Sequence, residues 1–143
     1  MSDDGLVYPT FRTPARQLAG MDGLSEDDVK HHVKSWLEGL GWQVRVAWGQ
    51  SRGIDILAKK GDEHWIIEAK GGGSSQPMRV NYFLAVLGTI LQRIEDPSAR
   101  HSIALPDMTQ FRGLWGRLPR LAKERVALTA LFVDPAGSVE IAD

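Results

Sequence analysis

The stretch GIDILAKKGDEHWIIEAK, residues 53–70, predicts two β-strands joined by a tight turn. Apolar and polar residues alternate on both sides of the dipeptide Gly61-Asp62, which is typical of a two-residue hairpin loop. Counting outward from that turn places Asp55 directly opposite Glu68, with Cβ atoms about 5 Å apart. The sequence therefore predicts a β-hairpin that brings two carboxylates together.

An ammonium group is predicted on the same face of this hairpin. Lys70 lies two residues beyond Glu68, roughly 7 Å further along the strand. Like charges placed opposite each other destabilise a strand pair, and buried charges are costly unless they are compensated. A divalent cation would remove the repulsion, because Mg²⁺ binds carboxylate oxygens and keeps waters for a substrate phosphate. The alternative is an exposed face on which Asp55, Glu68 and Lys70 are merely solvated, but the apolar Trp-Ile-Ile run before Glu68 favours the metal site.

The pattern of Asp55 followed, at the end of the next strand, by Glu68-Ala69-Lys70 resembles the active-site signature of the PD-(D/E)XK nuclease superfamily. That superfamily has the restriction-endonuclease-like fold and includes archaeal Holliday-junction resolvases and methylation-dependent restriction enzymes. The resemblance covers about residues 25–105, and Ile54 stands where the motif has a proline.

The resemblance implies a Mg²⁺-dependent endonuclease, with Mn²⁺ as a substitute ion. Asp55 and Glu68 would bind the ion together with the backbone carbonyl of Ala69. Lys70 would orient or help to deprotonate the attacking water, or neutralise charge on the phosphate.

A helix is predicted before the hairpin. Ser25-Glu-Asp-Asp28 is similar to a capping box, an apolar stripe follows, and Gly41 ends the helix. A glutamate of the first helix often assists the metal site in the nuclease superfamily, which makes Glu26 a candidate ligand. Helix capping is the alternative role for Glu26.

Three residues are candidates for contacts with nucleic acid. Arg52 belongs to the glycine-flanked segment 49–53, beside the predicted site, although a plain turn would explain the glycines equally well. Arg79 and Asn81 lie at the start of a helix predicted for residues 77–95, where a helix terminus attracts phosphate. Capping and hydrogen bonding within the core are the alternative roles for Arg79 and Asn81.

The predicted fold is of the α/β (α+β) class and has a three-layer core. The order is helix, three strands, helix and strand, followed by a helical piece and a C-terminal hairpin that ends the chain. It matches the αβββαβ core of the restriction-endonuclease-like fold, which implies a central mixed sheet flanked by helices. The two C-terminal strands are expected to extend this sheet.

Length and composition predict one domain. The 143 residues divide into an extended arm, residues 1–24, and a single nuclease-like domain, residues 25–143. The chain has no cysteine, so thiolate chemistry and disulfides are excluded. No apolar run approaches the length of a membrane span, and we expect a cytoplasmic protein without membrane contact. The formal net charge is −1, so any surface that binds DNA must be locally basic.

Two other classes of function are compatible with the sequence. The first is a catalytically silent nuclease-fold module that binds nucleic acid or a protein partner. The second is an unrelated interaction protein, motivated by five tryptophans and the largely apolar helix. A nuclease with one site per chain would need a homodimer or a larger assembly to cut both strands of a duplex. DNA is the expected partner, although RNA, branched and single-stranded substrates stay open.

Overall fold

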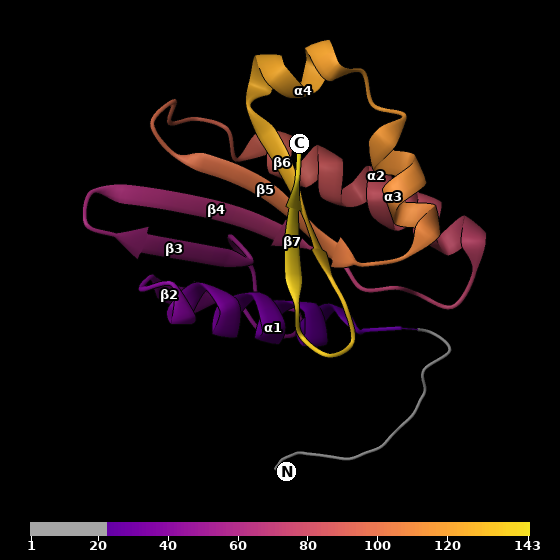
Figure 1. Cartoon of the computed structure of the whole chain (residues 1–143), viewed down its shortest axis with the longest axis horizontal. Coiled ribbons are helices and arrows are strands. Elements are labelled where there is room, and N and C mark those ends of the chain that lie inside the picture. Colours follow the sequence, from indigo (N-terminus) through magenta and orange to yellow (C-terminus); the bar gives the residue numbers. More distant parts are fainter. Residues whose placement is uncertain (1–22) are drawn as a thin grey trace.

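A computed structural model describes residues 23–143, which form four helices around one six-stranded sheet (Figure 1). In chain order the elements are α1 (Glu26–Gly39), β2 (Gln43–Val46), β3 (Ile56–Lys60), β4 (Glu63–Ala69), α2 (Gln76–Gln92), β5 (Arg100–Pro106), α3 (Thr109–Gly116), α4 (Arg120–Val126), β6 (Leu128–Val133) and β7 (Val139–Ala142). The α+β class and the predicted order are therefore confirmed.

The sheet is mixed, with the strands in the order β2-β3-β4-β5-β6-β7. Antiparallel pairing joins β2 to β3, β3 to β4 and β6 to β7. Parallel pairing joins β4 to β5 and β5 to β6, with helices in both connections. The C-terminal hairpin extends the sheet at its β7 edge, as the sequence predicts.

The hairpin formed by β3 and β4 has the predicted register. Lys60 pairs with Glu63 across the turn, and Ile56 pairs with Ile67 at the far end. Gly61 has a φ of +60° in the turn, a conformation that glycine adopts without steric cost. Asp55 lies immediately before Ile56, the first residue of β3. It therefore stands at the level of Glu68, where the pairing of β3 with β4 ends.

Helix α1 covers one face of the sheet. The Ser25 hydroxyl accepts a hydrogen bond from the backbone N–H of Asp28, and the Asp28 carboxylate accepts one from the backbone N–H of Ser25. This capping box fixes the start of the helix. The apolar stripe of α1 is fully buried against strand residues of the α1 face (Val29, Val33, Leu37, Ile56, Ala58, Trp65, Ile67, Ala69).

Helices α2 and α3 cover the opposite face, which completes the three layers (Figure 1). Phe83, Val86 and Ile90 of α2 are buried there together with alternate residues of β5 and β6. The outer face of α2 leaves Leu84 59% exposed, so this largely apolar helix is packed on one side only. α2 ends at Gln92, three residues before the predicted end.

The predicted arm, residues 1–24, lies outside the described residues except for Gly23 and Leu24. Leu24 packs against the core on the α1 side. Between Gly23 and Asp143 no helix is long and apolar enough to span a bilayer.

Candidate active site

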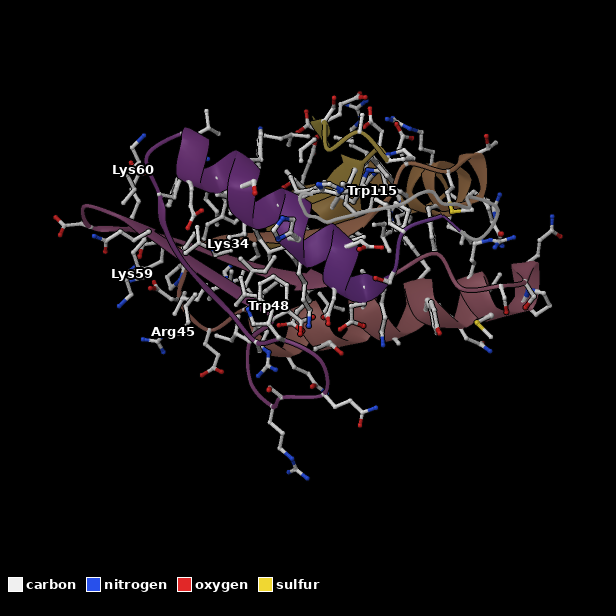
Figure 2. All side chains as sticks on the ribbon, turned by 90° about the horizontal axis from the view of Figure 1, so that it is seen from below. Lys34, Arg45, Trp48, Lys59, Lys60 and Trp115 are labelled. Atoms are coloured by element: carbon white, nitrogen blue, oxygen red, sulfur yellow. The ribbon has the colours of Figure 1, made fainter. Side chains whose placement is uncertain are left out.

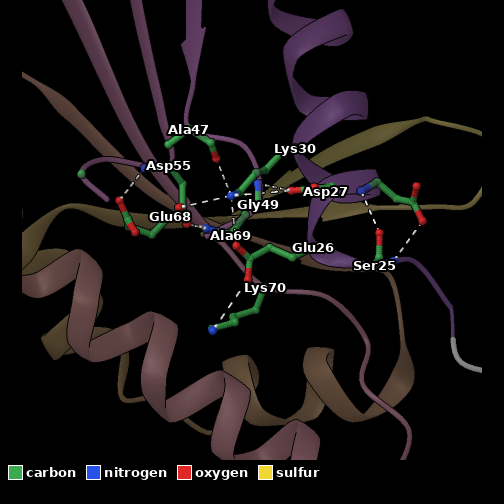
Figure 3. Close-up of polar contacts among 12 residues, drawn as sticks. Ser25, Glu26, Asp27, Lys30, Ala47, Gly49, Asp55, Glu68, Ala69 and Lys70 are labelled. Carbon is green, nitrogen blue, oxygen red and sulfur yellow. Dashed lines mark hydrogen bonds and ion pairs between the residues drawn. The ribbon is translucent and has the colours of Figure 1, made fainter. Parts of the chain in front are cut away.

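The two carboxylates predicted from the hairpin meet where the β3–β4 ladder ends (Figure 3). The backbone N–H of Asp55 donates to Oε2 of Glu68 at 3.0 Å, and the backbone N–H of Ala69 donates to Oδ2 of Asp55 at 2.9 Å. Each carboxylate therefore binds the main chain of the opposite strand. These two backbone hydrogen bonds leave one oxygen of each carboxylate unused, Oδ1 of Asp55 and Oε1 of Glu68.

Glu68 is deeply buried, with 3% of its surface exposed. Burial raises the pKa of Glu68 from its ordinary value of 4.5 to about 7; the backbone hydrogen bond from Asp55 opposes this rise, and the negative charge of Asp55 adds to it. The buried carboxylate is thus a site where a cation would be strongly favoured.

Arg93, at the C-terminal end of α2, is a cation near Glu68 that sequence reasoning missed. Its Nε lies 3.5 Å from Oε2 of Glu68, and its Nη2 donates to the carbonyl of Gly53 at 3.1 Å. The Nε atom is buried and has no hydrogen-bond partner among the described residues. Arg93 lies 25 positions after Glu68, so nothing local in the sequence indicates the contact.

Lys70 reaches a cleft of about 390 Å³ between the starts of α1 and α2. Its Nζ lies 3.7 Å from Oε1 of Glu26 and 5.2 Å from the ring centroid of Tyr82, which also lines the cleft. One third of the Lys70 side chain is exposed. Lys70 is therefore held by an ion pair and a cation–π contact, and it stays accessible to a ligand.

Gly71 brings the end of β4 into close contact with the start of α1. A Cβ atom at this position would lie 2.5 Å from the backbone nitrogen of Glu26, which no side chain tolerates. The backbone N–H of Gly72 donates to the carbonyl of Leu24 at 2.8 Å. This close approach places Lys70 beside Glu26.

The structure gives the capping role to Ser25 and Asp28 and directs Glu26 toward two lysines (Figure 3). Oε2 of Glu26 lies 3.0 Å from Nζ of Lys30, a residue that sequence reasoning did not select. Lys30 follows Val29 of the buried stripe, and its spacing of four residues from Glu26 was the one signal in the sequence.

The three residues predicted to contact nucleic acid differ in their surroundings. Arg52 is exposed in the segment between β2 and β3, and Asn81 is exposed on α2. The guanidinium of Arg79 is engaged within the protein, because Nε donates to the Gln110 side chain at 2.7 Å and Nη1 donates to the carbonyl of Gly72 at 3.3 Å. The geometry thus favours the alternative of internal hydrogen bonding for Arg79.

The donor set fits a Mg²⁺ ion held by two carboxylates and solvent. No three carboxylate, imidazole or thiol side chains in the described part of the chain are grouped so as to hold a metal ion. Asp55 and Glu68 nevertheless lie together at the end of the hairpin, and each has a second carboxylate oxygen that takes no part in the backbone hydrogen bonds from Asp55 and Ala69. Mg²⁺ is commonly bound by one or two carboxylates plus waters and substrate phosphate, so a closed protein cage is not required.

Two solved structures are similar to this chain in fold. One is an XisH family protein from Nostoc punctiforme PCC 73102, with a TM-score of 0.55 and 20% identity, covering 80% of this chain and 98% of that one. The other is an fdxN element excision controlling factor protein from Anabaena variabilis, with a TM-score of 0.55 and 19% identity, covering 82% and 99%. No protein-family model matches the chain, and no curated protein matches it. The chain thus has the fold of the XisH family structures over most of its length.

Proposed function

We propose that this chain is a metal-dependent nuclease that hydrolyses phosphodiester bonds, with DNA as the expected substrate. The observation that carries the proposal is the carboxylate pair of buried Glu68 and half-buried Asp55, with Lys70 two residues beyond Glu68 at the edge of an open cleft. A buried acid beside a second acid is costly to keep in a fold, and such arrangements are concentrated at functional sites.

In this proposal Asp55 and Glu68 hold Mg²⁺, or Mn²⁺ as a substitute, together with the Ala69 carbonyl. A bound ion of this kind supplies Lewis-acid polarisation of the phosphate and lowers the pKa of a bound water. Asp55 and Glu68 hold the ion at the hairpin end because the main chain of the opposite strand fixes one oxygen of each carboxylate.

Lys70 is proposed to act on the phosphate or on the attacking water. Lys70 lines the cleft, which neither Asp55 nor Glu68 lines, and its ammonium is held there by Glu26 and the Tyr82 ring. A positive group in this position stabilises negative charge that develops on the phosphate oxygens. The ammonium also donates a hydrogen bond to the oxygen of the attacking water and so orients it.

Exposed basic residues of β2 and β3 form a surface that extends along the strands from the acids toward the hairpin turn. Arg45 and Lys59 are exposed, and strand alternation places both on the face of the sheet that carries Glu68. Figure 2 shows Arg45 and Lys59 on the hairpin side of the molecule beyond Trp48. We propose that this surface, with Arg52 and Asn81, contacts the phosphate backbone of the substrate.

The similarity to an excision controlling factor supports a nucleic acid as the partner. The name of that protein refers to the excision of an element, a process that acts on nucleic acid. At 19% identity the likeness concerns the fold, and the chemistry is argued from the residues of this chain.

The test of cleavage is a panel of labelled duplex, branched and single-stranded DNA and RNA, incubated with Mg²⁺, Mn²⁺ or EDTA. We expect Asp55→Asn, Glu68→Gln and Lys70→Met each to abolish metal-dependent cleavage. Glu124→Gln, at an exposed position of α4, is the matched control and should cut like the wild type. Equal cleavage by the wild type and all three site variants would exclude this site.

The test of the binding surface is the salt dependence of affinity for uncleaved DNA in EDTA. Replacing Arg45 or Lys59 by Gln should weaken binding and reduce the slope of log K against log salt by about 1 per lost phosphate contact. Arg79→Gln should leave that slope unchanged, because its guanidinium is bound to Gln110 and Gly72.

The alternative is a silent module that binds nucleic acid or a protein without cutting. The ion pairs of Asp55 with Lys30 and of Glu68 with Arg93 favour it, since the acids already have cationic partners within the protein. Calorimetric titration separates the two functions: a silent module takes up no Mn²⁺, whereas the nuclease does.

Cleavage of both strands in one encounter would require two copies, because residues 23–143 of each chain form one such site. We therefore propose a homodimer on duplex DNA. Light scattering with and without duplex measures this, and a strict monomer that makes double-strand breaks in one encounter would contradict it.

A further inference from the structure

Lys30 carries a fully buried ammonium group at the centre of several oxygen atoms (Figure 3). Its Nζ donates to the carbonyl of Ala47 at 2.6 Å. It lies 3.0 Å from Oε2 of Glu26, 3.5 Å from Oδ1 of Asp55 and 3.9 Å from Oδ1 of Asp27. These oxygens come from α1 and from the two ends of the segment between β2 and β3, so one cation joins the helix to both ends of that segment.

The charge of Lys30 is maintained in spite of its burial. One carbonyl oxygen and three carboxylate oxygens lie around the ammonium and compensate its positive charge. Burying an ammonium without such partners would be very unfavourable. An ammonium surrounded by a carbonyl and carboxylates has the oxygen environment that a hard metal cation would also have.

The contact with Asp55 links Lys30 to the proposed metal site. Oδ2 of Asp55 is bound by the backbone N–H of Ala69, and Oδ1 faces Lys30. Two-metal nuclease sites use a carboxylate shared between ions about 3.5–4 Å apart. In this chain the Asp55 oxygen on the α1 side is already next to a fixed positive charge.

We propose that the Lys30 ammonium occupies the place of a second divalent cation, so that the site accepts a single ion between Asp55 and Glu68. The inference rests on the proposed function. It also assigns Glu26 to the two lysines and not to the ion, because its oxygens face Lys30 and Lys70.

The balance of charge around the site agrees with one divalent ion. The carboxylates of Glu26, Asp27, Asp55 and Glu68 face the cations of Lys30, Lys70 and Arg93, which leaves one excess negative charge when all are ionised. One divalent ion turns this into one excess positive charge, and a second ion would make it three. Without Lys30 the site would have two excess negative charges, which a second ion would neutralise in part.

The experiment counts Mn²⁺ ions per chain by calorimetry and by electron paramagnetic resonance. We expect one ion in the wild type, two in Lys30→Met and one in Lys30→Arg. Lys34→Met is the matched control, because Lys34 lies on the same helix but pairs with Glu38, and it should bind one ion. A loss of stability alone would not create a second site, so the stoichiometry separates this role from a structural one.

A second variant tests the inference if Lys30→Met does not fold. Glu26→Gln should still bind one Mn²⁺ ion per chain, because the Glu26 oxygens face Lys30 and Lys70 and not the ion. Two ions in the wild type, one ion in a folded Lys30→Met, or no bound ion in Glu26→Gln would overturn the role of Lys30. A wild type that binds no Mn²⁺ would overturn the proposed function itself.

Discussion

The burial of Glu68 makes the stability of the metal-free protein depend on pH in a direction that can be measured. The pKa of Glu68 is about 7 in the folded protein, against an ordinary value of 4.5. The folded state therefore binds more protons than the unfolded state between these two values. It follows that the free energy of unfolding falls as the pH rises from about 4.5 to about 7.

The magnitude follows from the size of the pKa difference. Each pKa unit corresponds to about 1.4 kcal/mol, so ionising Glu68 in the folded state costs on the order of 3 kcal/mol by pH 8. Glu68→Gln removes the titrating group and keeps an acceptor oxygen for the backbone N–H of Asp55. We expect the variant to gain on the order of 3 kcal/mol relative to the wild type between pH 5 and pH 8.

The assay is urea unfolding of both proteins at pH 5 and pH 8 in EDTA, followed by tryptophan fluorescence. Taking the difference between the two proteins removes the contribution of histidines, which titrate in both. Glu124→Gln, in which the carboxylate is exposed, should parallel the wild type. Saturating Mg²⁺ should restore the wild type at pH 8, because a bound cation favours the ionised carboxylate. Parallel pH profiles for the wild type and Glu68→Gln would refute the reasoning.

Two further predictions concern backbone positions and can be checked by urea unfolding. Gly71→Ala should destabilise the protein by about 1–3 kcal/mol, because its Cβ would meet the backbone nitrogen of Glu26 at 2.5 Å. The matched change Gly88→Ala, in open space on α2, should be neutral or stabilising by up to about 1 kcal/mol, and equal effects at the two glycines would contradict the close approach. Ala127→Gly should stabilise by about 1 kcal/mol, since Ala127 ends α4 with a φ of +54°, and a lower urea midpoint in this variant would count against that account.

The hairpin could be predicted from sequence because the residues that determine its turn and register are close together in the chain. The Gly61-Asp62 turn sets the register, and the register places Asp55 at the level of Glu68. The capping box of α1 is local in the same way. These features depend on residues a few positions apart, where turn and cap chemistry decides the conformation.

The cations around the acids could not be predicted in this way. Lys30 reaches Asp55 only because α1 packs across the sheet, and Arg93 reaches Glu68 only because α2 runs back along it. Both contacts join residues that are 25 positions apart in the chain. The close approach at Gly71 is also a product of packing, because the backbone of Glu26 that it meets lies 45 positions earlier in the chain.

The backbone hydrogen bonds that the Asp55 and Glu68 carboxylates accept, from Ala69 and Asp55 respectively, have a consequence for the evolution of such a chain. These carboxylates continue the strand pairing of β3 and β4 after the main-chain ladder stops, so they serve the fold as well as any chemistry. If the proposed nuclease function holds, a descendant that lost it would still be under selection to keep both acids. The Lys70 side chain has no such role in the sheet, since among the described residues its ammonium contacts Glu26 and the Tyr82 ring. Under the proposed function, loss of the lysine should therefore precede loss of the acids among homologous chains and mark inactive members.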